Sequence, residues 1–206
     1  MLRTAAPLIG ALGVGLKMAI LRSFEDYPAE AALIGRMLAG YTDIEVDLMN
    51  CVKSVRQDLD TVFKAMYRTR GETARIEIAD SFGRQFYHGL QLGTEFEMAL
   101  GAVRHCLKIR NLFAHASIWN DNSGTLAIAN LETLAYENRR IDDLHTMTVH
   151  HLNVPVLTSQ FDYFNYTSDL LVWVLNEGNG RANRPQLPEM ERPQWQRPKP
   201  ALYVEE

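Results

Sequence analysis

The chain has 206 residues, of which 47% are hydrophobic and 22% are charged, a balance typical of a globular protein that can bury its own core. The net charge of −4 argues against a broad positive surface that follows a long nucleic-acid backbone, but it leaves room for a small basic pocket that binds one phosphate. Cys51 and Cys106 each lie in an apolar helical pattern, without the spacing of a disulfide or a metal site. We therefore expect two reduced core thiols and a cytoplasmic protein.

Residues 1–27 are expected to form a leader or an extra helix. The first 21 residues have a basic start and an apolar run, as a weak signal peptide does, but Lys17 interrupts the run and three glycines thin it. The run is also too short to span a bilayer, so no membrane segment is expected.

Residues 28–177 are expected to form one helical domain. Pro28 can occupy the first turn of a helix, and Gly71 can end a helix just before the next one begins. Apolar residues recur at the i, i+3, i+4, i+7 spacing of a buried helix face. The helices expected from this spacing cover about 28–55, 59–70, 72–90, 94–116 and 158–176, and Gly40 can kink or divide the first of them. The expected fold is therefore a mainly all-α, up-and-down helical bundle.

A small β insertion is expected after the fourth of these helices. Two short apolar runs flank the turn-forming sequence Asn-Asp-Asn-Ser-Gly at 120–124, which favours a β-hairpin near 117–130. Residues 148–156 are expected to add one more extended piece.

Residues 178–206 form a proline-rich tail that contains five of the eight prolines of the chain. This proline content excludes a regular helix or a central strand. The tail is expected either to be disordered or to lie extended over a partner. Trp195 and Tyr203 favour the second possibility, because wholly solvated tails rarely carry large aromatic side chains.

No pattern for a metal or a cofactor is present in the sequence. His150 and His151 are adjacent, so on a strand they face opposite sides and cannot clasp one ion. No H-x-x-x-H, H-E-x-x-H or C-x-x-C pattern occurs, and there is no P-loop or G-x-S-x-G elbow. We therefore expect no bound metal and no cofactor.

The helix expected over 94–116 places Arg110 at the centre of its apolar face, among Val103, Leu107, Ile109 and Phe113. A buried guanidinium without a partner is very costly, so this position requires either a carboxylate or an interface that supplies an anion. The structural alternative is an ion pair with an inward-facing acid. The acids considered are Glu95, Asp47 and Asp43.

A separate polar stripe follows the same helix at the i, i+4, i+7 and i+11 spacing. Its members are Arg104, Lys108, Asn111 and His115. A second basic cluster occurs at the end of the preceding helical hairpin, where it is either an RNA-binding surface or a solvated helix end. This cluster consists of Lys64, Arg68, Arg70 and Arg75.

The sequence Arg-Asn-Leu-Phe-Ala-His resembles the R-x4-H signature of the HEPN superfamily (higher eukaryotes and prokaryotes nucleotide-binding). The six residues are Arg110, Asn111, Leu112, Phe113, Ala114 and His115. In that superfamily a polar residue, frequently asparagine, follows the arginine, and the motif lies late on a long helix of an all-α bundle. The resemblance covers about 28–176 in architecture, but only these six residues in detail.

The resemblance implies metal-independent RNA cleavage, as in the toxin and defence members of the superfamily. His115 is then the base that takes a proton from a ribose 2′-OH. Arg110 holds the scissile phosphate, and Asn111 orients a phosphate oxygen or the histidine ring. One histidine supplies only a base or only an acid, so the resemblance also implies a homodimer that brings two motifs into one cleft.

Two readings of the function remain open at this point. In the first, the chain is a ribonuclease that acts on single-stranded or loop RNA, binds it through Arg104, Lys108, Lys64, Arg68 and Arg70, and is paired with a cognate antitoxin. In the second, the chain resembles the mannitol operon repressor-like families and is a non-catalytic module that binds a regulatory protein or a nucleotide. Toxins silenced by nucleotidyltransferase antitoxins usually carry a tyrosine two places after the histidine, where this chain has Ser117.

Overall fold

The computed structural model describes residues 21–136, 140, 147–188, 190–194 and 197–205. Most of the leader or extra helix expected over 1–27 therefore lies outside the described residues. So does Trp195, one of the two aromatic residues that suggested a docked tail.

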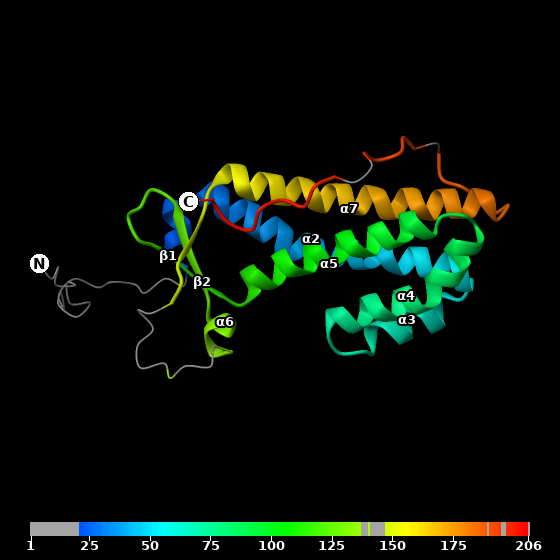
Figure 1. The fold of residues 1–206 in the computed structure, drawn as a ribbon, viewed down its shortest axis with the longest axis horizontal. Coiled ribbons are helices and arrows are strands. Elements are labelled where there is room, and N and C mark those ends of the chain that lie inside the picture. The colour runs from blue at the N-terminus through cyan, green and yellow to red at the C-terminus, as the bar shows by residue number, and fades with distance from the viewer. Residues whose placement is uncertain (1–20, 137–139, 141–146, 189, 195–196, 206) are drawn as a thin grey trace, which may run out of the picture.

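The described part of the chain is a helical bundle with a small sheet at one end (Figure 1). Figure 1 shows α2, α5 and α7 side by side along the long axis, with α3 and α4 covering the half farther from the sheet. α2 and α7 lie side by side and run in the same direction, as the contacts of Asp47 with Ser168 and of Cys51 with Leu171 show, and α5 runs opposite to both. The expected mainly all-α fold is confirmed. The helices are α1 (Ser23–Asp26), α2 (Pro28–Arg56), α3 (Leu59–Tyr67), α4 (Glu72–Gly89), α5 (Gly93–Ala114), α6 (Leu131–Ala135) and α7 (Val154–Arg181).

Local capping sets several of the helix boundaries. The Asp58 side chain accepts from the Thr61 amide at the start of α3, and Gln57 ends α2 in the left-handed region with φ of 54°. α7 begins at Val154, earlier than expected, because the Asn153 side chain accepts from the Val156 amide and a proline fits the first turn. The extended piece expected over 148–156 is correspondingly shorter.

The small sheet is antiparallel and has the strand order β1-β2-β3. Its strands are β1 (Ala116–Asn120), β2 (Leu126–Asn130) and β3 (His150–Leu152). The pairing of Ala116 with Asn130 and of Asn120 with Leu126 confirms the hairpin expected near 117–130. The central strand β2 is almost wholly buried, and it fixes the sheet against the end of the bundle where α5 stops.

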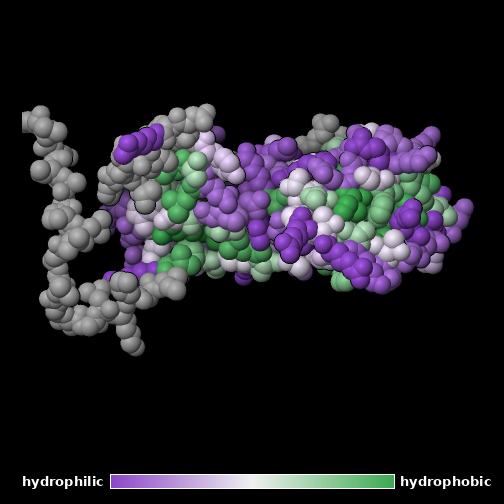
Figure 2. Space-filling model, turned by 90° about the horizontal axis from the view of Figure 1, so that it is seen from below, coloured by the Kyte–Doolittle hydropathy of each residue, from purple (hydrophilic) through white to green (hydrophobic). Residues whose placement is uncertain are grey.

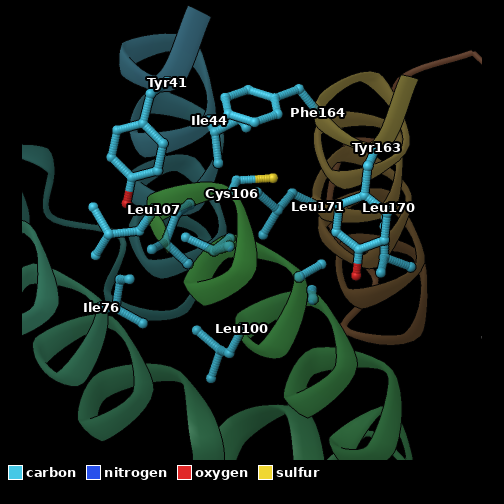
Figure 3. Packing of buried hydrophobic residues seen from close by; sticks show 14 of the residues in the cluster. Tyr41, Ile44, Ile76, Leu100, Cys106, Leu107, Tyr163, Phe164, Leu170 and Leu171 are labelled. Carbon is cyan, nitrogen blue, oxygen red and sulfur yellow. The ribbon is translucent and has the colours of Figure 1, made fainter. Parts of the chain in front are cut away.

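The hydrophobic core runs between the three long helices (Figure 3). Figure 3 shows side chains of α2, α5 and α7 meeting there, among them Ile44, Cys106 and Leu171. Cys51 and Cys106 are buried free thiols, as expected from the sequence. Burial raises the pKa of each thiol to about 12, so both stay protonated and unreactive at neutral pH. No described helix combines the length and the apolar character needed to cross a membrane.

The described part of the proline-rich tail lies extended along its own chain (Figure 1). At its start the Leu187 amide donates to Asn176 Oδ1 at 2.7 Å. Near its end the Val204 amide donates to the His151 carbonyl at 2.9 Å. The tail therefore returns from the far end of α7 to the sheet, and the surface that it covers belongs to this chain.

Candidate functional site

The R-x4-H residues lie at the point where α5 ends and β1 begins. His115 leaves the helix with φ of −120° and ψ of 13°, and its amide still donates to the Asn111 carbonyl. The hairpin starts at the next residue, so the sheet holds the end of the helix in place. Arg110 and Asn111 are therefore on the last turn of α5, and His115 is at its C-terminal boundary.

The apolar residues around Arg110 are buried by this chain alone. Val103 and Ile109 are 0% exposed, Phe113 is 5% exposed and Leu107 is 6% exposed. The structure therefore accounts for this apolar face without a second chain, and it does not leave these residues for a subunit interface. Arg110 itself lies at the edge of the face, with 29% of its side chain exposed.

The partner of Arg110 is Glu72 of α4 and none of the three acids expected. Arg110 Nη2 lies 3.7 Å from Glu72 Oε1, and Nη1 donates to Asn111 Oδ1 at 3.0 Å. The expected acids are engaged or placed elsewhere. Glu95 contacts Arg192, Asp47 accepts from Ser168, and Asp43 lines a groove between α2 and α7. The expectation was wrong because the Arg110 side chain extends toward the first turn of α4.

A tighter ion pair lies next to Arg110. Arg75 Nη1 donates to both carboxylate oxygens of Glu45 at 2.9 Å, and the Arg75 guanidinium lies 5.1 Å from the centre of the Tyr67 ring. The Tyr41 hydroxyl is buried nearby without a partner, and burial, together with the charge of Glu45, raises its pKa above the usual range. Arg75, a member of the expected basic cluster, thus has a structural partner.

His115 faces α6 rather than α4. Its Nδ1 lies 3.3 Å from Glu132 Oε1, with 44% of the histidine side chain and 60% of the glutamate side chain exposed. A carboxylate at this distance can orient an imidazole ring. Within one chain, therefore, Arg110 and His115 contact different helices, and Asn111 lies between them in the sequence.

A hollow of about 280 Å³ lies beside this part of α5. It is bounded by α5, by α6 with the residue before it, and by the end of the tail. Its lining residues are Lys108, Asn111, Leu112, Asn130, Glu132, Thr133, Leu202 and Tyr203. The hollow thus collects two of the expected site residues, Lys108 and Asn111, together with the glutamate that contacts His115.

The other basic residues expected to bind RNA are not brought to this hollow. Arg104 Nη2 lies 3.7 Å from Asp80 on α4, and Lys64 forms an i, i+4 pair with Asp60 at 2.6 Å. Arg68 and Arg70 are exposed on the turn that follows α3. These four residues lie on the α3–α4 side of the molecule, on the other side of Arg110.

Three residues of this region were not expected from the sequence. Glu72 and Glu132 are first-turn residues of α4 and α6, where acidic side chains are common, so nothing in their local sequence distinguished them. Tyr203 did carry a signal, as an aromatic residue in a proline-rich tail. Its position beside α5 could not be predicted, because it depends on the path that the tail takes along the bundle.

No cluster of three His, Cys, Asp or Glu side chains that could hold a metal ion occurs among the residues that the structure describes. In comparisons with known proteins, no family model matches the chain, and no curated protein or solved structure matches it either. The likeness to the HEPN superfamily therefore rests on the six motif residues and on their place at the end of a long helix.

Proposed function

We propose that the chain is a HEPN-like, metal-independent endoribonuclease of the toxin or defence type. The observation that carries this proposal is the state of Arg110. Its guanidinium is partly exposed and, among the residues that the structure describes, is hydrogen-bonded only to its neighbour Asn111 and lies 3.7 Å from a Glu72 carboxylate oxygen. That distance is too long for a hydrogen bond, so donors remain for a phosphate.

The proposed reaction uses the three polar residues of the motif. His115 takes the proton from a ribose 2′-OH, whose oxygen attacks the adjacent phosphorus. The bond from phosphorus to the 5′ oxygen breaks, and that oxygen takes a proton from an acid. The products are a 2′,3′-cyclic phosphate and a 5′-OH. Arg110 stabilises the charge on the phosphate oxygens, and the free NH2 of Asn111 can donate to one of them.

In the proposed reaction the acid is the His115 of a second copy, because one imidazole supplies either the base or the acid. We therefore propose that two copies form the complete site. Figure 2 shows, on the face seen from below, hydrophobic patches that lie between hydrophilic ones. A contact between copies would be mixed in character, since large apolar side chains such as Phe63, at 50% exposure, are scattered. Sedimentation at micromolar concentration tests this, and a clean monomer contradicts it.

Cleavage of a labelled single-stranded RNA in EDTA tests the proposal. His115→Ala is expected to lower the rate by about two to four orders of magnitude, the usual contribution of such a group. His88→Ala is the matched control, because His88 is an exposed histidine on α4 that also contacts a glutamate, at 3.6 Å. Folding should survive both changes, as each side chain is about half exposed.

The alternative is a non-catalytic, HEPN-like regulatory module that binds a protein or a nucleotide. One observation favours it: Arg110 and His115 each already lie beside a carboxylate of the same chain, Glu72 for Arg110 and Glu132 for His115. In this case wild type cleaves no RNA, and His115→Ala lowers the melting temperature by several degrees because a structural contact is lost.

A further inference from the structure

The last residues of the chain form one wall of the hollow beside the motif. Leu202 and Tyr203 line it opposite Lys108 and Asn111 of α5. A proline-rich tail would not ordinarily define a binding surface, because its position is not fixed by regular hydrogen bonding. Here, several contacts fix the position of its last residues.

Three kinds of contact hold this end of the tail. Gln160 of α7 is 0% exposed, and its Nε2 donates to the carbonyls of Ala201 and Leu202 at 2.8 and 3.0 Å. The Val204 amide donates to the His151 carbonyl of β3. The Tyr203 ring stacks on His150, with centroids 3.8 Å apart and planes within 6°. The buried Gln160 amide and the stacked His150 ring therefore hold Tyr203 beside the hollow.

The polar groups around the hollow are mainly donors. No carboxylate pairs with Lys108 among the described residues, and the Asn111 oxygen is occupied by Arg110, which leaves the NH2 group to donate. The Asn130 oxygen is occupied by the amides of Glu132 and Thr133. A ligand that fits these groups is rich in acceptors, with Glu132 available to one donor on the ligand.

Positive charge also gathers at this edge of α5. His105 lies one turn before Lys108, and burial lowers its pKa, with further contributions from the nearby charges of Lys199 in the tail and of Lys108. Two ammonium groups close enough to affect the same imidazole create a local field that favours an anion.

We infer that the hollow is a subsite for one nucleotide of a single-stranded RNA, with Tyr203 beside the base and Lys108 on its phosphate. This inference rests on the proposed function, because it places the nucleotide next to the phosphate that Arg110 and His115 act on. The volume of about 280 Å³ lies just below the range of small-molecule sites, which begins at about 300 Å³, so the hollow has room for no more than one nucleotide. A base reaches such a site only when it is unstacked, as in single strands and loops.

Binding is measured apart from cleavage, with the full chain carrying His115→Ala and a fluorescent ten-nucleotide single-stranded RNA, by anisotropy. Adding Tyr203→Ala is expected to weaken binding about tenfold, within the range measured for the loss of one base–aromatic contact. Adding Lys108→Gln is expected to weaken binding and to reduce its salt dependence by about one phosphate contact. Tyr136→Ala is the matched control, because Tyr136 is 86% exposed and does not line the hollow.

Tyr203→Phe removes the hydroxyl group and keeps the aromatic stacking surface. It should therefore bind the RNA within about twofold of the parent. If the parent binds no RNA, or if both Tyr203→Ala and Lys108→Gln bind as the parent does, the inference is overturned. In the second case, His115-dependent cleavage by wild type still supports the proposed function. Tyr203-dependent binding without any cleavage supports the subsite and counts against the ribonuclease.

Discussion

Two arginines border the same side of the core and differ in how they are held. Arg75 makes two hydrogen bonds of 2.9 Å to Glu45, whose side chain is only 8% exposed. Arg110 lies 3.7 Å from Glu72, whose side chain is 31% exposed. The first arginine joins α4 to α2 through a buried carboxylate, and the second only approaches the first turn of α4.

The difference separates a charge that holds helices together from one that can bind a ligand. Removing one partner of a buried pair leaves an uncompensated charge, so such a pair cannot release its arginine without a large loss of stability. An exposed pair at 3.7 Å contributes little, and its arginine can exchange a carboxylate for a phosphate. We therefore assign Arg75 to the fold and Arg110 to the proposed site.

The largest expected effect on stability comes from Glu45→Ala. The change leaves the Arg75 guanidinium at the edge of the core without its carboxylate, and we expect a loss of about 3 kcal/mol in the free energy of unfolding. Urea unfolding at pH 7 measures it. Glu77→Ala, an exposed glutamate of α4, is the control and should change the free energy by less than about 0.5 kcal/mol. Equal losses in the two variants would contradict the structural role of the pair.

Arg110→Lys is expected to lower RNA cleavage about tenfold and to leave stability nearly unchanged. Lysine keeps the charge but loses the planar fork that can bind two oxygens of a phosphate. Initial rates on single-stranded RNA measure the effect, with Arg84→Lys as the control on an exposed, ion-paired arginine. Full activity in Arg110→Lys shows that bidentate binding plays no part.

A third contact, between His151 and Asp121, is short but partly exposed to solvent, so we expect it to contribute little to the free energy of unfolding. His151 Nε2 lies 2.9 Å from Asp121 Oδ2, which ties β3 to the hairpin turn. Hydrogen bonds from Ser123 and the contact with His151 lower the pKa of Asp121 to about 2. Because the folded pKa is depressed, this contribution is present above the unfolded pKa of about 3.9 and is lost as the pH falls through about 2.

Asp121→Asn should therefore lower the free energy of unfolding by no more than about 1 kcal/mol at pH 6. The gap between variant and wild type should narrow as the pH falls from about 4 toward 2. Denaturant unfolding at a series of pH values measures it. If the difference in free energy between Asp121→Asn and wild type grows as the pH falls, the carboxylate of Asp121 does not stabilise the fold in this way.

Glu72→Gln should have the smallest effect. If the pair with Arg110 is as loose as its distance indicates, the free energy of unfolding should change by less than about 0.5 kcal/mol. Thermal or urea unfolding is sufficient to measure it. A loss of 2 kcal/mol or more, on the order of a tightly held pair, removes the contrast between the two arginines.

The sequence predicted the helices well because their signals are local. Pro28 and the apolar spacing of each segment act within a few residues, and both are reflected in the observed boundaries. Gly71 was expected to end the second helix, but α3 already ends at Tyr67, and Gly71 instead precedes the first residue of α4. The hairpin was predicted for the same reason, from five turn-forming residues between two apolar runs. The start of α7 was missed because the cap at Asn153 follows two histidines that also suit a strand.

The partners of the motif residues could not be predicted, because they depend on contacts between distant segments. Glu72 precedes Arg110 by a whole helix, and the sequence offered at least three other acids in the same helical bundle. The path of the tail could not be predicted either. The buried Gln160 side chain and the His151 carbonyl hold its end through bonds to backbone groups, and such bonds leave no pattern in the residues of the tail.

The most direct measurement of the central claim compares Arg75→Met with Arg110→Met in parallel, by the free energy of unfolding and by the rate of RNA cleavage in EDTA. We expect Arg75→Met to lose about 3 kcal/mol in the free energy of unfolding, while its folded fraction keeps the wild-type cleavage rate. We expect Arg110→Met to lose less than about 1 kcal/mol, while its rate of RNA cleavage falls about a hundredfold or more. The contrary result is an Arg110→Met protein that is as destabilised as Arg75→Met and cleaves RNA at the rate of wild type.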